Sequence, residues 1–150
     1  MTKAVPKTLR GKLGRLGACS EARKWGNGQD PRKAWYACTE PDWLLWLCAY
    51  LLPRRYLRLA LAAILRAQAL PNAGTAADVV QRVIDLLERG AEPEEYHAAA
   101  AAADDAAYAA KDYNQARSAQ CDIIRGAVPW RAVRAAAVRR GLLETKRRNP

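Results

Sequence analysis

An almost unbroken run of alanine occupies residues 98–110 and limits the folds open to this chain. Alanine has the highest intrinsic helix propensity, so the run predicts a helix rather than a strand. Pro93 suits the first turn of that helix and Gly126 suits its end, so we expect one long helix over residues 93–125. Alanine buries little area, so such a helix gains stability only where its neighbours pack closely against it.

Short proline and glycine signals divide the rest of the chain into further helical segments, without the strict apolar–polar alternation of strands. The expected helices span residues 21–25, Pro31–Cys38, Trp43–Leu52, Arg54–Leu70, residues 76–89 and Trp130–Arg140. Ser20 and Asp30 are the expected N-caps of the first two, and Gly90 is the expected residue after the end of the helix over 76–89. The segment Arg54–Leu70 is apolar on nearly every side after a basic first turn, which predicts a buried helix. In residues 76–89 the predicted apolar stripe consists of Val79, Val80, Val83, Leu86 and Leu87.

These segments predict an all-α fold, a compact bundle of six to seven helices with one long alanine-rich central helix and basic terminal arms. A chain of 150 residues is long enough to bury a core without metals or disulfides. We expect a single helical domain over residues 17–141, a basic N-terminal arm over residues 1–16 and a basic C-terminal tail over residues 142–150.

Positive charge is concentrated at the two ends of the chain. The whole chain carries a net charge of +10, with +7 in residues 1–35, −4 in residues 36–124 and +7 in residues 125–150. Such a distribution attracts nucleic acid, anionic lipid or an acidic protein. A solubilising surface with two basic tails is the alternative interpretation.

The basic side chains of the two ends and of the last helix are the candidate binding residues, for a protein or for nucleic acid. They are Lys3, Lys7, Arg10, Lys12, Arg15, Arg131, Arg134, Arg139, Arg140, Lys146, Arg147 and Arg148. Basic arms can contact phosphates, but they give affinity without reading a base sequence. The chain has no homeodomain, zinc-finger or RNA-recognition signature, so we do not expect sequence-specific recognition.

Residues able to carry catalytic chemistry are sparse. The single histidine, His97, is expected on the surface of the alanine-rich helix. The sequence has neither a phosphate-binding loop nor a nucleophile-elbow motif. We therefore expect no enzyme activity and no cofactor.

The four cysteines, Cys19, Cys38, Cys48 and Cys121, are spaced too irregularly for the close pairs of zinc sites. A zinc site would require Cys19, Cys38 and Cys48 to converge with His97. We expect core thiols and no bound metal.

The chain lacks the features of secreted and membrane proteins. Its N-terminal residues have no apolar segment behind their charges, unlike a secretory signal. The longest apolar run, Trp43–Leu52, is about half of the roughly 18 residues that span a bilayer. We expect a cytoplasmic location and no membrane partner.

Five tryptophans are many for a chain of this size. Trp43 and Trp46 are three residues apart and share a helix face. The tryptophans could form an aromatic core between the first helices and the alanine-rich helix, or they could provide an exposed aromatic surface for a partner.

The order of tryptophans, cysteines and alanine-rich helix resembles an alanine-rich helical family of immunity proteins from bacterial polymorphic-toxin loci, also found in phage and mobile elements. The matching residues are Gly17–Ala22, Trp25, Ala34-Trp35, Cys38, Asp42–Leu47, the alanine-rich run, Gln120–Arg125 and Pro129-Trp130, within roughly residues 9 to 135. The resemblance implies a non-catalytic protein that binds and neutralises a partner. The family has no catalytic residues to carry over.

The charge bears on which partner is expected. Inhibitors that imitate nucleic acid are acidic, and this basic chain is unlike them. An acidic protein or a nucleoprotein complex is the expected partner, as for an immunity protein or a phage anti-defence inhibitor such as an anti-CRISPR protein. The alternatives are a nucleic-acid-binding accessory protein that uses its basic arms on RNA or DNA, and a phage structural protein that self-associates. The oligomeric state stays open.

Overall fold

The computed structural model describes residues 4–90 and 96–145, with side chains from residue 98 onward in the second range. In this part of the chain all regular structure is helical, which confirms the all-α prediction. The α-helices are α1 (Leu9–Leu16), α2 (Ser20–Gly26), α3 (Pro31–Ala37), α4 (Pro41–Leu51), α5 (Arg54–Ile64), α6 (Ala77–Glu88), α7 (Tyr96–Ala109), α8 (Tyr113–Ala127) and α9 (Trp130–Arg139). A π-helical turn (Leu65–Ala69) and two short 3₁₀ turns (Leu70–Asn72 and Gly74–Ala76) connect α5 to α6.

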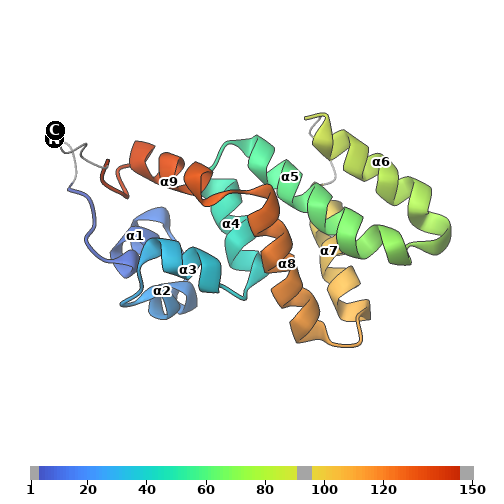
Figure 1. Cartoon of the computed structure of the whole chain (residues 1–150), viewed down its shortest axis with the longest axis horizontal. Coiled ribbons are helices and arrows are strands. Elements are labelled where there is room, and N and C mark those ends of the chain that lie inside the picture. The colour runs from blue at the N-terminus through green and yellow to red at the C-terminus, as the bar shows by residue number, and fades with distance from the viewer. Residues whose placement is uncertain (1–3, 91–95, 146–150) are drawn as a thin grey trace.

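Helix α5 lies at the centre of the molecule and contributes to both hydrophobic clusters (Figure 1). Ala60 and Ile64 belong to the larger cluster, which α3, α4, α8 and α9 complete. Leu61 and Leu65 belong to the smaller cluster with α6 and α7. Two adjoining faces of this helical segment are therefore buried, in agreement with its predicted apolar circumference.

The predicted long central helix is wrong, because α7 and α8 are separate helices joined by a turn at residues 110–112 (Figure 1). Asp112 has extended backbone angles, and its carboxylate accepts a hydrogen bond of 3.0 Å from the amide of Gln115. This is an N-cap, which starts a new helix. The rings of Tyr108 and Tyr113 stack across the turn at 4.7 Å between centroids. The described residues therefore form nine α-helices rather than six or seven.

The apolar face of α6 also differs from the predicted stripe. Ile84 is completely buried with Leu87, whereas Val79 is 58% exposed. Val80 and Val83 pack beside the two buried side chains. The buried face is thus rotated relative to the prediction, because α6 packs mainly on one neighbour, α5.

Several helix ends agree with the sequence signals. Asp30 caps α3 by accepting a hydrogen bond of 3.1 Å from the amide of Lys33. Gly90 follows α6 with φ of +81°, a left-handed conformation that favours glycine at a helix end. Ser20, predicted as an N-cap, is instead the first residue of α2.

Leucines just outside both limits of the predicted domain pack against its core. Leu16 of α1 packs against the larger cluster, and Leu142, predicted in the tail, is buried in it. Gly26 of α2 lets α1 approach closely, since a Cβ there would lie 2.9 Å from Leu13 Cδ1. The packed domain therefore includes residues on both sides of the predicted limits at 17 and 141.

Candidate binding site

The N-terminal and C-terminal segments of the chain meet at Lys12. Its Nζ donates a hydrogen bond of 2.6 Å to the carbonyl of Pro6 and another of 2.6 Å to the carbonyl of Leu142. An ammonium group has three N–H donors, so one is left by these two contacts. Burial is the largest influence on Lys12 and lowers its pKa, while the charge of Glu144 acts in the opposite direction.

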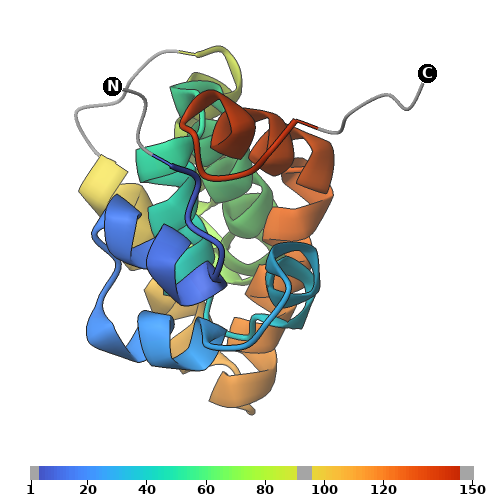
Figure 2. The ribbon, with the colours of Figure 1, turned by 90° about the vertical axis from the view of Figure 1, so that its left-hand side faces the viewer.

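Arg15 joins the same two segments one turn further along α1. Its guanidinium donates to the carbonyl of Ala4 at 2.6 Å and to the carbonyl of Gly141 at 3.3 Å. Figure 2 shows the segment before α1 beside the segment after α9. We call Lys12, Arg15, Gly141 and Leu142 the terminal junction. It brings the two basic ends of the sequence onto one side of the molecule.

Further cationic side chains lie at the end of α9 and at the start of α5. Arg140 donates a hydrogen bond of 3.1 Å to the carbonyl of Tyr50, at the end of α4. Tyr50 is 60% exposed as a residue, and its ring stacks on Trp46 at 4.9 Å between centroids. The guanidinium of Arg55 lies 4.7 Å from the ring centroid of Tyr56. We call Lys12, Arg15, Tyr50, Arg55 and Arg140 the terminal basic surface.

The structure thus brings together only some of the predicted binding residues. Lys12, Arg15 and Arg140 contribute to the terminal basic surface. The remaining described candidates are exposed or half-buried, on the N-terminal segment and α1 (Lys7, Arg10) or on α9 (Arg131, Arg134, Arg139). Lys3, Lys146, Arg147 and Arg148 lie outside the described residues. Sequence reasoning missed Tyr50 and Arg55, although the basic first turn of α5 pointed to this region.

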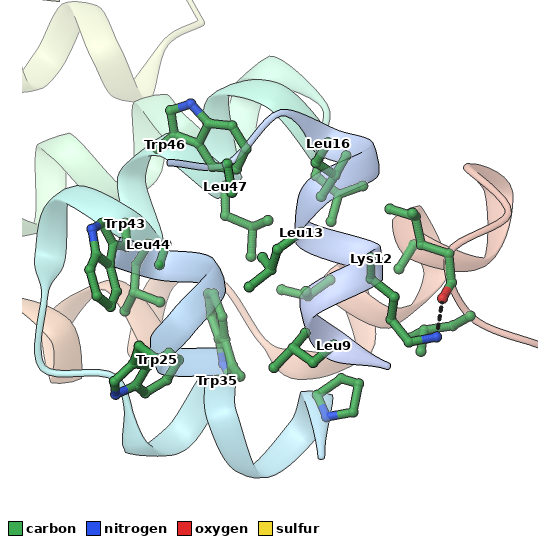
Figure 3. Close-up of a pocket in the computed structure, with 18 of the residues that line it drawn as sticks. Leu9, Lys12, Leu13, Leu16, Trp25, Trp35, Trp43, Leu44, Trp46 and Leu47 are labelled. Atoms are coloured by element: carbon green, nitrogen blue, oxygen red, sulfur yellow. Dashed lines mark hydrogen bonds between the residues drawn. The ribbon is translucent and has the colours of Figure 1, made fainter. Parts of the chain in front are cut away.

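The five tryptophans share a second feature, a cavity of about 320 Å³ between α1–α4 and α9 (Figure 3). Trp25, Trp35, Trp43, Trp46 and Trp130 all line it, together with leucines of α1 and α4. Trp25 and Trp43 are in contact at 5.6 Å between ring centroids. The tryptophans therefore combine the two predicted arrangements, since they pack in the core but also border an open space.

Trp35 is the most buried of these rings, with 4% of its surface exposed. Its Nε1 is buried without a hydrogen-bond acceptor among the described residues. Its backbone carbonyl is held, because Arg125 donates hydrogen bonds of 3.0 Å to the carbonyls of Trp35 and Cys38. This contact fixes the end of α3 on α8 and with it one wall of the cavity.

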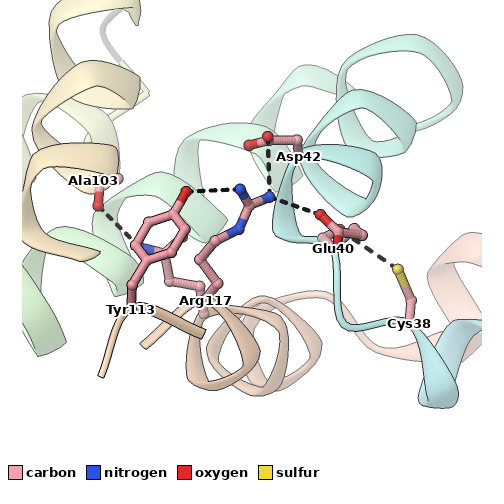
Figure 4. A network of polar contacts seen from close by, with 7 residues as sticks. Cys38, Glu40, Asp42, Ala103, Tyr113 and Arg117 are labelled. Carbon is pink, nitrogen blue, oxygen red and sulfur yellow. Dashed lines mark hydrogen bonds and ion pairs between the residues drawn. The ribbon is translucent and has the colours of Figure 1, made fainter. Parts of the chain in front are cut away.

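A polar network holds the start of α4 on α8 (Figure 4). Arg117 Nη2 lies 2.8 Å from Glu40 Oε2 and 3.2 Å from Asp42 Oδ2, and Nη1 donates to the Tyr113 hydroxyl at 2.9 Å. Burial alone would lower the pKa of Arg117, but the tyrosine and the two carboxylates raise it above its ordinary value. Asp42 also lines the cavity, with its carboxylate bonded to Arg117.

Three of the four cysteines are buried, as predicted for core thiols, whereas Cys19 is exposed. Burial raises the pKa of Cys48 to about 12, so its thiol stays protonated at neutral pH. A hydrogen bond between the thiols of Cys38 and Cys121 lowers the pKa of Cys38 and raises that of Cys121. Among the described side chains, those of residues 4–90 and 98–145, no three His, Cys, Asp or Glu come together as metal ligands would. The side chain of His97 lies outside the described residues.

None of the helices described is both long enough and apolar enough to cross a membrane. Comparison of the chain with protein-family models, with curated proteins and with solved structures found no match.

Proposed function

We propose that this chain is a non-catalytic cytoplasmic protein that binds and neutralises an acidic protein or a nucleoprotein complex, such as a toxin or a CRISPR-type complex. The observation that carries the proposal is the terminal junction, where Lys12 and Arg15 join the two basic ends of the chain. Charges that are far apart in the sequence thereby act as one positive field. A field of this kind steers acidic partners and speeds their association.

The residue types of the terminal basic surface also favour an interface. Arginine, tyrosine and tryptophan dominate the binding energy of protein interfaces. Tyr50 is exposed, and its ring stacks on Trp46. A partner would therefore contact a ring that is already held in one orientation. Arg140 lies against the backbone of Tyr50 and adds charge beside that ring.

The test is capture of partners from host lysate treated with nuclease at about 0.15 M salt. The wild type is compared with the double variant Arg55→Glu/Arg140→Glu, which reverses charge on the terminal basic surface. The matched control is Arg32→Glu/Arg82→Glu, which reverses two exposed arginines on α3 and α6. We expect one protein or nucleoprotein to be captured by the wild type and the control and to be lost with the surface variant. Equal capture by all three proteins would contradict the proposal.

A second candidate function is a nucleic-acid-binding accessory protein, and the exposed Tyr50 ring beside Arg140 favours it. Bases of single strands stack on exposed aromatic rings while cationic side chains follow the phosphates. The test is fluorescence anisotropy with a labelled single-stranded oligonucleotide over a range of salt concentrations. This function predicts that log affinity falls linearly with log salt and that Tyr50→Ala weakens binding. If Tyr50→Ala binds like the wild type, stacking at this ring has no role.

A further inference from the structure

The cavity lined by the tryptophans is built from segments far apart in the chain. Helix α1 supplies Leu9, Leu13 and Leu16, α4 supplies Trp43, Trp46 and Leu47, and residues 142 and 143 close it from the C-terminal side. At about 320 Å³ it falls within the range of roughly 300–1,000 Å³ that is typical of small-molecule sites. The space opens to solvent on one side, so it is a pocket rather than a closed void in the core.

The residues that line the cavity favour a ligand that is mostly apolar. Apart from Lys12, Cys19 and Asp42, the lining side chains are tryptophan, leucine, alanine, valine and proline. Side chains that border a void lose dispersion contacts on that side. An apolar molecule that fills the space would restore those contacts and remove its own surface from water.

Two donors left over by the protein's own contacts indicate the polar group of the ligand. Lys12 has one N–H beyond its bonds to Pro6 and Leu142, and the Nε1–H of Trp35 is buried without an acceptor. The buried Trp35 Nε1–H lacks an acceptor, and the half-buried Lys12 offers a free N–H and a positive charge at the edge of the cavity. The acidic residue in the lining, Asp42, does not offset this charge directly, because it is bonded to Arg117.

We propose that the cavity binds a small amphipathic carboxylate, of the size of a medium-chain fatty acid, with its chain among the tryptophans and its carboxylate accepting a hydrogen bond from Lys12. Binding is non-covalent and requires no other group. The positive field of the terminal junction favours the anion over its uncharged analogue. This site is distinct from the terminal basic surface in all but Lys12, so it can be tested separately from the proposed function.

The first experiment titrates the wild-type chain with sodium decanoate and follows intrinsic tryptophan fluorescence, since every tryptophan lines the cavity. A series of hexanoate, octanoate, decanoate and dodecanoate should bind about fourfold more tightly for each added methylene until the cavity is full. The uncharged 1-decanol should bind about tenfold more weakly than decanoate. Equal affinity for the alcohol would overturn the role of Lys12. Absence of saturable binding up to about 1 mM decanoate would overturn the site.

Substitutions in the lining of the cavity then test whether decanoate binds there. Ala137 of α9 lines the cavity, and Ala137→Leu would occupy part of it with a larger side chain. We expect this variant to retain its melting temperature and to bind decanoate at least about tenfold more weakly. The matched control is Ala135→Leu, which adds the same side chain at an exposed position of the same helix. Unchanged affinity in Ala137→Leu would show that decanoate binds elsewhere.

The charge requirement is tested with Lys12→Met, which keeps most of the side-chain length. The control is Lys7→Met, at an exposed lysine that is not part of the lining. In Lys12→Met, decanoate and 1-decanol should bind with equal affinity, whereas Lys7→Met should keep the wild-type preference for decanoate. If Lys12→Met does not fold, the comparison of decanoate with 1-decanol on the wild type still decides the point.

Discussion

Gly26 and Gly126 are both helical glycines, yet they stand in opposite surroundings. A Cβ at Gly26 would lie 2.9 Å from Leu13 Cδ1 and 3.3 Å from Leu9, where α1 crosses α2. A Cβ at Gly126, on the exposed side of α8, would meet no atom within 4 Å. The same substitution should therefore have opposite effects at the two positions.

We expect Gly26→Ala to lower the free energy of unfolding by about 1–3 kcal/mol, because the side chains of Leu13 and Leu9 would have to leave their packed positions. Gly126→Ala should raise it by about 0.4–1 kcal/mol, since alanine reduces the entropy of the unfolded chain and favours the helix. Urea denaturation followed by circular dichroism measures both. A Gly26→Ala protein as stable as the wild type would show that α1 and α2 are not closely packed.

Because the thiol of Cys48 is buried, the free energy of unfolding should depend on pH in the alkaline range. Its pKa is about 12 in the folded chain and about 9 when exposed, so the unfolded state loses its proton first as pH rises. The protonated Cys48 thiol therefore contributes fully to the free energy of unfolding below pH 9. Between pH 9 and 12 this free energy falls by at most about 1.4 kcal/mol for each pH unit. Cys48→Ala should flatten the pH dependence of the unfolding free energy in this window. The exposed Cys19→Ala is the control and should leave the slope unchanged.

At the scale of helices, the alanine-rich segment was correctly predicted to be helical, but the break within it was not predicted. Alanine propensity predicted helix on both sides of residue 111, and caps such as Asp30 and Gly90 lie where the signals placed them. The break at Asp112 was missed because an aspartate inside a helical pattern can also be an exposed side chain on a continuous helix. The rotated face of α6 was missed because Val79 and Ile84 are equally apolar, and only the position of α5 decides which is buried.

Asp112→Ala should destabilise the chain by about 0.5–2 kcal/mol, because the amide of Gln115 loses its capping acceptor. Asp105→Ala is the matched control, since Asp105 is an exposed aspartate within α7 and alanine is a better helix former there. Thermal unfolding followed by circular dichroism compares the two variants. If they unfold at the same temperature, the Asp112 side chain does not hold the turn between α7 and α8.

At the scale of the whole molecule, the sequence predicted that both ends are basic but not that they meet. Lys12 and Leu142 are 130 residues apart, and local patterns say nothing about such a contact. The tryptophan cavity was beyond prediction for the same reason, since residues from α1 to residue 143 line it. The individual tryptophans pointed to an aromatic cluster, and only the three-dimensional arrangement of helices leaves a space among them.

If the terminal junction holds the two ends together, its loss should loosen both at once. Hydrogen exchange should show faster exchange of the amides of α1 and of Leu142 and Leu143 in Lys12→Met, with the amides of α8 unchanged. In the wild type the amides of Leu142 and Leu143 are bonded to the carbonyl of Ala137. Faster exchange at only one end of the chain would show that the ends are held independently. Lys7→Met serves as the control.

The terminal junction also bears on the order in which the chain can fold during synthesis. Helices α4, α5 and α6 are neighbours in sequence and can pack while later residues are still being added. The bonds from Lys12 and Arg15 to residues 141 and 142 cannot form until those residues have left the ribosome. At about 5–20 residues per second, α1 spends seconds with its leucines and the neighbouring tryptophans incompletely covered. The interval before residues 141 and 142 emerge is thus when these side chains are most exposed to aggregation or to chaperone binding.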